Sequence, residues 1–362
     1  MTSIAESDVE NVLRTVVDPN LGQDLMAAKS VKKIEVEGAD VRVKIVLGYP
    51  AARFKAVLAE TVREKLCALA GVGNVSVEVG WEIVSHAVQK NLKPMPGVKN
   101  IIAVASGKGG VGKSTTAVNL ALALAAEGAR VGILDADIYG PSQPSMLGLS
   151  GRPETDGNTI VPKTAYGVQS MSIGYLIDED TPMIWRGPMV TGALQQLLNE
   201  TRWDKLDYLI IDLPPGTGDI QLTLAQQIPV SGAVIVTTPQ DIALLDAQKG
   251  LKMFEKVSVP VLGIVENMSV HVCSNCGHEE HIFGAGGGEK MAKKYGVELL
   301  GSLPLDIKIR EDADGGHPSV VADPDGPAAR RYKDIARKMA ARLALKAKDY
   351  SAKFPTISIV NT

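Results

Sequence analysis

The segment GKGGVGKST, Gly107 to Thr115, constrains the fold of this chain more than any other part of the sequence. It matches the pattern G-x-x-x-x-G-K-[ST], in which glycines let backbone N–H groups approach phosphate oxygens closely. An apolar run, Ile101 to Ser106, precedes the loop, and a stretch with helical spacing follows it as far as Ala126. A buried strand, a glycine-rich loop and a helix in this order predict a phosphate-binding loop at the edge of a parallel sheet.

Short apolar segments recur after the loop and alternate with stretches of helical spacing. They lie at residues 130–135, 208–212, 233–238, 261–267 and 299–304. Strands that alternate with helices form parallel sheets, because each helix carries the chain back to the start of the next strand. The pattern therefore predicts an α/β fold with a doubly wound, mostly parallel sheet, whose ligands bind beyond the carboxyl ends of the strands.

The beginning of the chain has a different pattern and predicts a small α+β domain. Val31–Val36 and the alternating segment Val41–Leu47 predict a hairpin, and Val75–Val79 predicts a third strand. Stretches of helical spacing precede and follow the hairpin, so the expected order is α-β-β-α-β. Ser7 and Glu10 have the spacing of a capping box at the start of the first helix.

These patterns predict that the chain is divided into four parts. The small domain covers residues 1–85, a polar segment with two prolines at 86–98 predicts a linker, the main domain covers 99–350, and 351–362 is a tail. Cys67 lies on or near a helix of the small domain and is expected to be buried as a small apolar residue.

The glycine loop and two acidic strand ends together predict a site for ATP and Mg²⁺. The nucleotide-binding residues expected in the loop are Gly107, Lys108, Gly109, Gly110, Val111, Gly112, Lys113, Ser114 and Thr115. Lys113 is expected to contact the β- and γ-phosphates, and the Ser114 hydroxyl to bind Mg²⁺ together with Asp212 at the end of its strand. Asp137, after the strand at 130–135, is the candidate for orienting the attacking water.

Cys273 and Cys276 form a C-x-x-C pair in a polar loop, which predicts a metal site. The context does not favour a redox dithiol, because that motif normally starts a helix early in a thioredoxin-like unit. A structural zinc ion and a [4Fe–4S] cluster each need four ligands. The flanking residues His271, His278 and His281 leave a one-chain zinc site open, whereas a two-fold dimer would supply two cysteines from each subunit.

The composition and net charge of the chain indicate which kinds of partner it can bind and in which cellular compartment it is found. The formal net charge is −3, so no bulk attraction to nucleic acid or to an anionic membrane is expected. The acidic, polar start is unlike a secretory signal, and no apolar run approaches the length of a membrane helix. Only three cysteines are present, which favours a reducing cytoplasm.

The loop resembles the deviant P-loop with a signature lysine that occurs in nitrogenase iron protein and in the septum-placement, partition and arsenite-pump ATPases. In this class the additional lysine reaches across a homodimer interface to the partner's nucleotide, a role that the resemblance gives to Lys108. The class also implies slow ATP hydrolysis that acts as a switch. Asn267, after the strand at 261–267, matches the class position whose amide reads adenine.

Further motifs make the resemblance more specific. They are VKNIIAVASGKGGVGKST, DADIYGPSQPSMLG, WRGPMVTGALQQ, YLIIDLPPGTGD, TTPQDIALLDAQKG and ENMS followed by C-x-x-C. Residues 99 to about 320 resemble the Mrp-type (ApbC-type) iron–sulfur carrier ATPases, and the small domain is similar to that of iron–sulfur assembly factors. Stand-alone members of that small-domain family carry a cysteine near the end of the hairpin. LGYPAA, residues 47–52, lacks it, so docking is the expected role of this domain.

The resemblance implies an ATPase whose homodimer holds a labile [4Fe–4S] cluster on Cys273 and Cys276 of both subunits. The cluster would be passed to apo iron–sulfur proteins, with scaffold proteins as further partners, under the control of ATP. Ser172 and Arg186 are candidates for coupling the two sites. The alternatives are a partition or membrane-positioning ATPase switch, whose terminal helix would bind lipid, and a zinc-stabilised nucleotide-binding regulator. The basic amphipathic segment 326–348 is expected to pack on the sheet instead.

Overall fold

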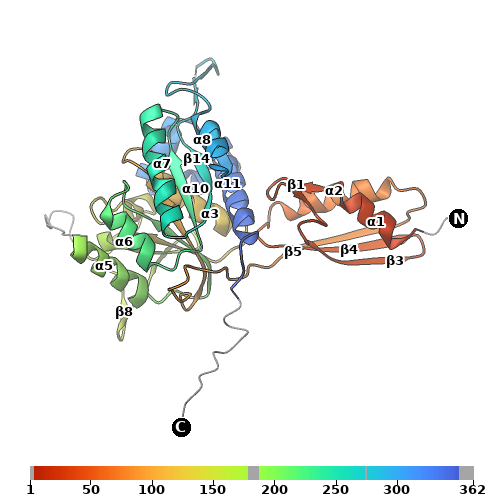
Figure 1. Ribbon diagram of the computed structural model, residues 1–362, viewed down its shortest axis with the longest axis horizontal. Coiled ribbons are helices and arrows are strands. Elements are labelled where there is room, and N and C mark those ends of the chain that lie inside the picture. The colour runs from red at the N-terminus through yellow and green to blue at the C-terminus, as the bar shows by residue number, and fades with distance from the viewer. Residues whose placement is uncertain (1–3, 178–186, 274, 350–362) are drawn as a thin grey trace, which may run out of the picture.

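The chain forms a small N-terminal domain that is joined to a larger α/β domain (Figure 1). The computed structural model describes residues 4–177, 187–273 and 275–349. Within this part of the chain, no helix is both long enough and apolar enough to cross a membrane.

The small domain has a three-stranded sheet covered by two helices, in the α-β-β-α-β order predicted from the sequence. Its main elements are α1 (Glu6–Leu13), β3 (Val31–Glu37), β4 (Asp40–Leu47), α2 (Lys55–Cys67) and β5 (Val75–Trp81). The two-residue strands β1 (Val17–Asp18) and β2 (Gln23–Asp24) lie between α1 and β3 and form a separate pair. The central strand β4 is antiparallel to β3 and parallel to β5. Its side chains alternate between buried and outward positions, as expected for a sheet with one covered face.

Two local predictions in this domain were wrong. Helix α1 begins two residues earlier than expected, with Ala5 instead of Ser7 as its N-cap and the Asp8 carboxylate accepting from the Ala5 N–H at 3.0 Å. Cys67 is exposed. The buried face of α2 carries Leu58, Val62 and Leu66, and Cys67 lies one residue, about 100°, further around the helix.

The large domain is built on an eight-stranded sheet in the order β10-β11-β7-β12-β6-β13-β14-β17. The strands are β6 (Val98–Ala105), β7 (Val131–Asp135), β10 (Lys163–Ala165), β11 (Val168–Ser172), β12 (Leu206–Asp212), β13 (Gly232–Thr237), β14 (Val261–Glu266) and β17 (Leu299–Ser302). Only the β10–β11 pair in this sheet, as far as it is described, is antiparallel. The doubly wound, mostly parallel sheet predicted from the sequence is therefore confirmed.

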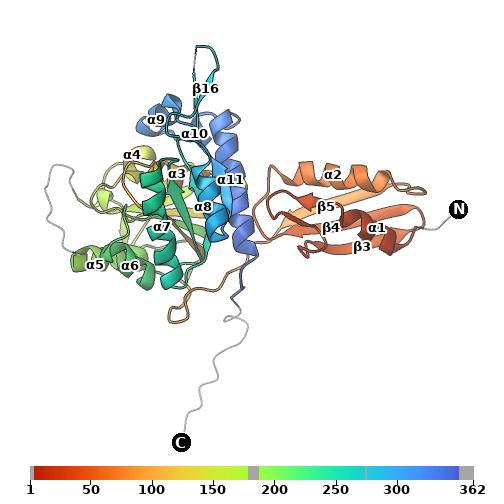
Figure 2. The same cartoon turned by 45° about the horizontal axis from the view of Figure 1, so that its top comes forward.

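Helices cover both faces of this sheet (Figures 1 and 2). They are α3 (Lys113–Ala126), α4 (Gln143–Met146), α5 (Gly187–Glu200), α6 (Asp219–Gln227), α7 (Asp241–Lys256), α8 (Gly287–Tyr295), α9 (Ile307–Asp314), α10 (Ser319–Ala322) and α11 (Pro327–Ala344). One buried cluster joins α3, α10 and α11 to the sheet and continues into the small domain. A second cluster joins α5, α6, α7 and α8 to the opposite face.

The C-terminal helix α11 packs on the sheet, as predicted. Its apolar positions Tyr332, Ile335, Met339 and Leu343 are at most 2% exposed. They belong to the cluster that also contains the apolar residues of α3. The apolar face of α11 is therefore already buried inside the protein.

Glu127, at the end of α3, connects the two domains. Its carboxylate is fully buried and lies 2.5 Å from the Arg337 guanidinium of α11. It also accepts from the Arg53 N–H at 3.0 Å, and its backbone oxygen accepts from the Ala52 N–H at 3.1 Å. The helix that begins in the glycine loop thus ends in contact with the small domain.

The segment expected to be a linker is also held against the large domain. The Gln89 amide donates to the backbone oxygens of Ala225 and Ile228 at 2.8 and 3.2 Å, and its oxygen accepts from the Val230 N–H at 3.1 Å.

Candidate functional site

The predicted nucleotide-site residues meet because their strands are neighbours. β6 leads into the glycine loop, and β12 lies between β6 and β7 in the sheet. Asp212 at the end of β12 is in register with Asp135 at the end of β7. The two acidic strand ends and the loop therefore lie at one edge of the sheet, where ligands of this architecture bind.

The glycines of the loop are required by its backbone path. Gly110 and Gly112 have φ angles of +77° and +79°, a region that residues with a Cβ rarely adopt. A Cβ on Gly107 would lie 2.2 Å from the backbone carbon of Asp246, and one on Gly112 would lie 2.2 Å from Nδ2 of Asn267. The sequence GKGGVGKST thus encodes the close contacts that bring the loop against α7 and β14.

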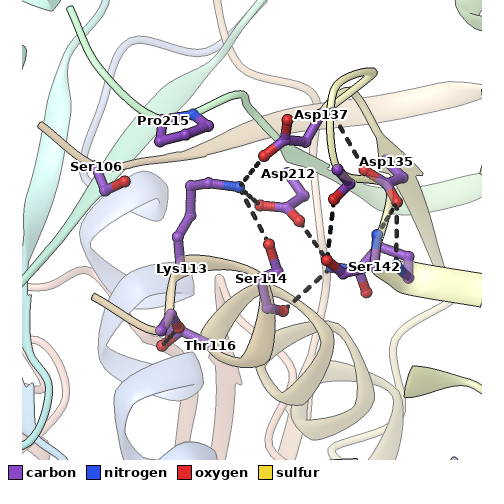
Figure 3. Close-up of polar contacts among 12 residues, drawn as sticks. Ser106, Lys113, Ser114, Thr116, Asp135, Asp137, Ser142, Asp212 and Pro215 are labelled. Carbon is purple, nitrogen blue, oxygen red and sulfur yellow. Dashed lines mark hydrogen bonds and ion pairs between the residues drawn. The ribbon is translucent and has the colours of Figure 1, made fainter. Parts of the chain in front are cut away.

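Lys113 is the central positive charge of the site (Figure 3). Its Nζ lies 2.5 Å from Asp212 Oδ1 and 3.7 Å from Asp137 Oδ2, and it donates to the Ser114 hydroxyl at 3.2 Å. Lys113 is only 6% exposed and Asp212 is fully buried. Three of the residues predicted to act on ATP and Mg²⁺ therefore surround the lysine that was expected to hold the phosphates.

Asp135 is buried beside this group and is held by an array of donors. Its carboxylate accepts from the N–H groups of Asp137, Ser142 and Gln143 at 2.9–3.1 Å, and from the Ser172 hydroxyl at 3.2 Å. Burial, reinforced by the charge of Asp212, raises the pKa of Asp135 to about 7. Ser172, a predicted coupling residue, thus contacts the nucleotide site. Arg186 lies outside the described residues.

Asp137 faces the cavity formed by the loop. Burial raises the pKa of its carboxyl group, although the Lys113 charge opposes this shift. The cavity has a volume of about 210 Å³, and it is lined by Ser106, Lys108, Gly109, Gly110, Gly112, Lys113, Ser114, Thr115, Asp137 and Pro215. Asp137 thus lies beside the cavity that the loop forms, and its role in orienting an attacking water stays a prediction.

Lys108 and Asn267 lie at the rim and at the back of this loop. Lys108 lines the cavity and is half-buried, and its ammonium forms no ion pair with any residue that the structure describes. The Asn267 amide donates to the backbone oxygen of Val111 at 2.9 Å, and its own oxygen accepts from the Met268 N–H. Asn267 therefore fixes the loop, and its predicted role in reading adenine stays a prediction.

Cys273 and Cys276 lie on a small ribbon between β15 (His271–Val272) and β16 (Glu279–Glu280), which projects away from the sheet (Figure 2). Cys273 is half-buried and Cys276 is exposed, and both are free thiols. The Cys273 N–H donates to the backbone oxygen of His278 at 2.9 Å. Hydrogen bonds from the N–H groups of Cys276 and Asn275 lower the pKa of the Cys273 thiol, which favours the thiolate that binds metals.

The histidines beside the cysteines do not complete a metal site. Nδ1 of His271 bonds to the backbone oxygen of Leu305 at 3.2 Å, and that of His281 to Ser269 at 2.8 Å, while His278 lies 4.0 Å from Glu280. Nowhere among the described residues do three His, Cys, Asp or Glu side chains gather as a metal site would require. The one-chain zinc site that the sequence left open is therefore not formed in this part of the chain.

One residue of the site was missed at the sequence level. The side chain of Gln143 is fully buried, and its amide nitrogen donates to Asp212 Oδ2 at 2.8 Å and to the backbone oxygen of Ser114 at 3.1 Å. Its position directly after Ser142, at the end of the loop that follows the acidic end of β7, was the available signal. A polar side chain at the start of a helix is so common, however, that this signal alone did not single it out.

The parallel sheet, the glycine loop and the carboxylates at the neighbouring strand ends define a P-loop nucleoside triphosphatase. Residues 97–340 match the family described as NUBPL iron-transfer P-loop NTPase, and residues 6–79 match the iron-sulfur cluster assembly protein family. The chain belongs to the iron-transfer P-loop NTPase family, with an iron–sulfur assembly domain at its N-terminal end. The membership predicted from the sequence motifs is thereby confirmed.

Individual relatives agree with this assignment. The chain is 53% identical to a protein of Haemophilus influenzae named iron-sulfur cluster carrier protein, over 95% of this chain and 93% of that protein. It is 63% identical to a protein of the same name from Pseudomonas fragi, over 74% and 94% of the two chains. Among solved structures, a nucleotide-binding protein from Archaeoglobus fulgidus in complex with ADP is 39% identical, covers 65% of this chain and 91% of its own, and has a TM-score of 0.57.

Proposed function

We propose that this ATPase carries a [4Fe–4S] cluster between two copies of the chain and passes it to apo iron–sulfur proteins. The observation that carries the proposal is the C-x-x-C pair on the projecting ribbon, where the described part of one chain offers two thiols and no third ligand. A cluster of this type takes four thiolates. A two-fold dimer supplies four, because an isologous interface repeats each contact on the other subunit.

The cluster is cargo in this account, and the exposure of its site suits that role. Cys276 is exposed and Cys273 half-exposed, so a receiving protein can approach the ligands directly. Ligands divided between two subunits also release their cargo when the subunits move apart. Scaffold proteins that build clusters are the expected donors, and the cytoplasm is the expected compartment, since free thiols persist there.

ATP and Mg²⁺ control the dimer in this proposal. Lys113 exchanges its carboxylate partners for the β- and γ-phosphates, Ser114 and Asp212 hold Mg²⁺, and Asp137 orients the attacking water. Lys108 extends from the cavity rim to the nucleotide of the other subunit. A charge supplied by the partner makes nucleotide binding and dimer formation one linked equilibrium.

The fit of Mg²⁺ is supported by the donor set of the site. A hydroxyl and a buried carboxylate, 3.2 and 2.5 Å from the same ammonium, are oxygen ligands of the type that this ion prefers. Lys113 now neutralises the Asp212 carboxylate, and a bound Mg²⁺ would take over this role when Lys113 turns to the phosphates.

A partition or membrane-positioning switch is not favoured. The apolar residues of α11, which such a switch would use for lipid binding, are buried against the sheet. That alternative also gives no role to the cysteine pair or to the N-terminal assembly domain.

Anaerobic reconstitution with iron and sulfide tests the proposal. We expect about four iron and four sulfide per dimer, with a brown colour that is lost in Cys273→Ala and in Cys276→Ala. Cys67→Ala is the matched control, because Cys67 is also an exposed free thiol but lies in the small domain. Equal loss in all three variants, or colourless protein with stoichiometric zinc, would overturn the proposal.

A further inference from the structure

One amide nitrogen contacts both residues to which the proposed function gives the magnesium ion. Gln143 Nε2 donates to Asp212 Oδ2 at 2.8 Å and to the backbone oxygen of Ser114 at 3.1 Å. The backbone N–H of the same glutamine donates to Asp135 Oδ2 at 3.0 Å. Gln143 thus connects the ends of β7 and β12 with the first turn of α3.

The orientation of this amide is determined by its neighbours. Both atoms within hydrogen-bond distance of Nε2 are oxygens that can only accept, so the nitrogen and not the oxygen must face them. The Oε1 atom is buried and has no donor among the described residues. An apolar side chain of similar size would fill the space without leaving a buried oxygen unpartnered, so packing alone does not explain a glutamine here.

The contact with Asp212 becomes more important when phosphates bind. In the present structure Lys113 bonds to Oδ1 and Gln143 to Oδ2 of this carboxylate. These are the hydrogen bonds that orient the Asp212 side chain. If Lys113 turns to a phosphate, Gln143 is the partner that remains, and it is tied to Ser114 at the same time.

We propose that Gln143 is a positioning residue for the magnesium ion, whose amide keeps the Asp212 carboxylate and the Ser114 turn in the relation that metal binding requires. This inference rests on the magnesium site of the proposed function. Residues that orient metal ligands change metal affinity by about 10–100-fold when they are lost. Nucleotide binding without metal depends on the loop N–H groups and on the Lys113 ammonium. The Gln143 amide bonds to none of these groups, because its contact with the loop is to the backbone oxygen of Ser114.

The test separates metal binding from nucleotide binding. Mn²⁺ serves as the probe, because it prefers the same oxygen ligands as Mg²⁺ and its free form is measured directly by electron paramagnetic resonance. Mn²⁺ is titrated into protein saturated with a non-hydrolysable ATP analogue, and affinity for the analogue is measured separately in excess EDTA. The variants are Gln143→Met, which keeps the size of the side chain, and Gln143→Asn, which keeps the amide but shortens its reach.

We expect both variants to weaken Mn²⁺ binding by about 10–100-fold, while affinity for the analogue in EDTA stays at the wild-type value. Retained affinity for the analogue also shows that a variant is folded. If Gln143→Met does not fold, the Mn²⁺ affinity of Gln143→Asn tests the positioning role. Gln89→Met is the matched control, because Gln89 also donates to two oxygens but lies outside the nucleotide site, and we expect it to change neither affinity.

Asp212→Asn distinguishes this inference from the proposal on which it rests. If Asp212→Asn weakens Mn²⁺ binding and the Gln143 variants do not, the positioning role is wrong and the magnesium site stands. If Asp212→Asn has no effect either, the magnesium site itself is wrong. Equal losses with and without metal in the Gln143 variants would also overturn the inference, because they would indicate a purely structural role.

Discussion

The Lys113 ammonium lies 2.5 Å from Oδ1 of the fully buried Asp212 carboxylate, so the phosphate-binding lysine already has an anionic partner before any nucleotide is bound. This pair holds the loop and the end of β12 together. It also means that ATP competes with a carboxylate for Lys113. Nucleotide binding is thereby linked to a rearrangement of the carboxylate that we assign to Mg²⁺.

Removing Lys113 should affect the free protein as well as nucleotide binding. Lys113→Met leaves Asp212 buried without its cation, and the loss of one partner of a buried ion pair costs about 3–5 kcal/mol of unfolding free energy. Denaturant unfolding of the nucleotide-free protein measures this cost. The double variant Lys113→Met, Asp212→Asn should be more stable than Lys113→Met alone, because it no longer buries an unpaired carboxylate. If Asp212→Asn instead lowers the stability of Lys113→Met further, the ion pair does not stabilise the free protein.

The raised pKa of Asp135 predicts a pH dependence of stability with a definite sign. Because its pKa is about 7 in the folded protein and 3.8 in the reference state, the folded protein binds the proton more tightly, so stability falls as pH rises between these values. Asp135→Asn removes this contribution. Relative to the variant, the wild-type protein should lose at most about 1.4 kcal/mol per pH unit over this range.

Unfolding of metal-free protein at several values between pH 4 and pH 8 measures that difference. Both oxygens of the Asp135 carboxylate accept from N–H groups, so the NH2 of an asparagine must face at least one of these donors. This lowers the stability of the variant by an amount that does not depend on pH, and only the slopes of the two stability curves are compared. Parallel stability curves for the two proteins would show that Asp135 does not have a raised pKa.

The domain junction should depend on the ion pair between Glu127 and Arg337. Glu127→Ala leaves the largely buried Arg337 guanidinium with only its exposed partner Asp334 and should cost up to about 3–5 kcal/mol. The exposed pair of Arg310 and Asp314 is a matched control, since Asp314→Ala should cost less than about 1 kcal/mol. Chemical denaturation measures both, and similar small losses would show that the junction is not fixed by Glu127.

Gly112→Ala should impair the loop without changing any charge. The backbone at this position has φ of +79°, and a Cβ would lie 2.2 Å from Nδ2 of Asn267. We expect a large loss of ATP affinity, measured by calorimetry, together with reduced stability. Gly157→Ala is the control, because its φ is also positive at +61° but nothing lies within 4 Å of the added Cβ; wild-type affinity in Gly112→Ala would contradict the geometry of the loop.

The parallel sheet was predictable because its inner strands are buried on both faces and therefore appear as uninterrupted apolar runs. All six predicted strands of the large domain are present. β11 was missed because its sequence, VQSMS, includes polar residues, and Ser170 and Ser172 are buried through hydrogen bonds rather than by apolar packing. The partner of Ser172 is Asp135, 37 residues away along the chain, so the local sequence gives no sign of that hydrogen bond.

The residues of the glycine loop and its acidic strand ends followed from spacing, but the contacts among them did not. The role of Gln143 depends on β7 and β12 being neighbours, which is a property of strand order and not of local sequence. For Cys67, the secondary structure was predicted but the exposure of the side chain was not. Its helix was predicted correctly, but one residue of rotation separates it from the buried face.

Native mass spectrometry of the reconstituted protein under anaerobic conditions tests the central claim most directly. We predict a wild-type dimer that carries one [4Fe–4S] cluster, and a Cys273→Ala variant that has lost both the cluster and the cluster-bridged dimer. A monomer that retains a complete cluster, or a dimer that carries one cluster on each subunit, would contradict it.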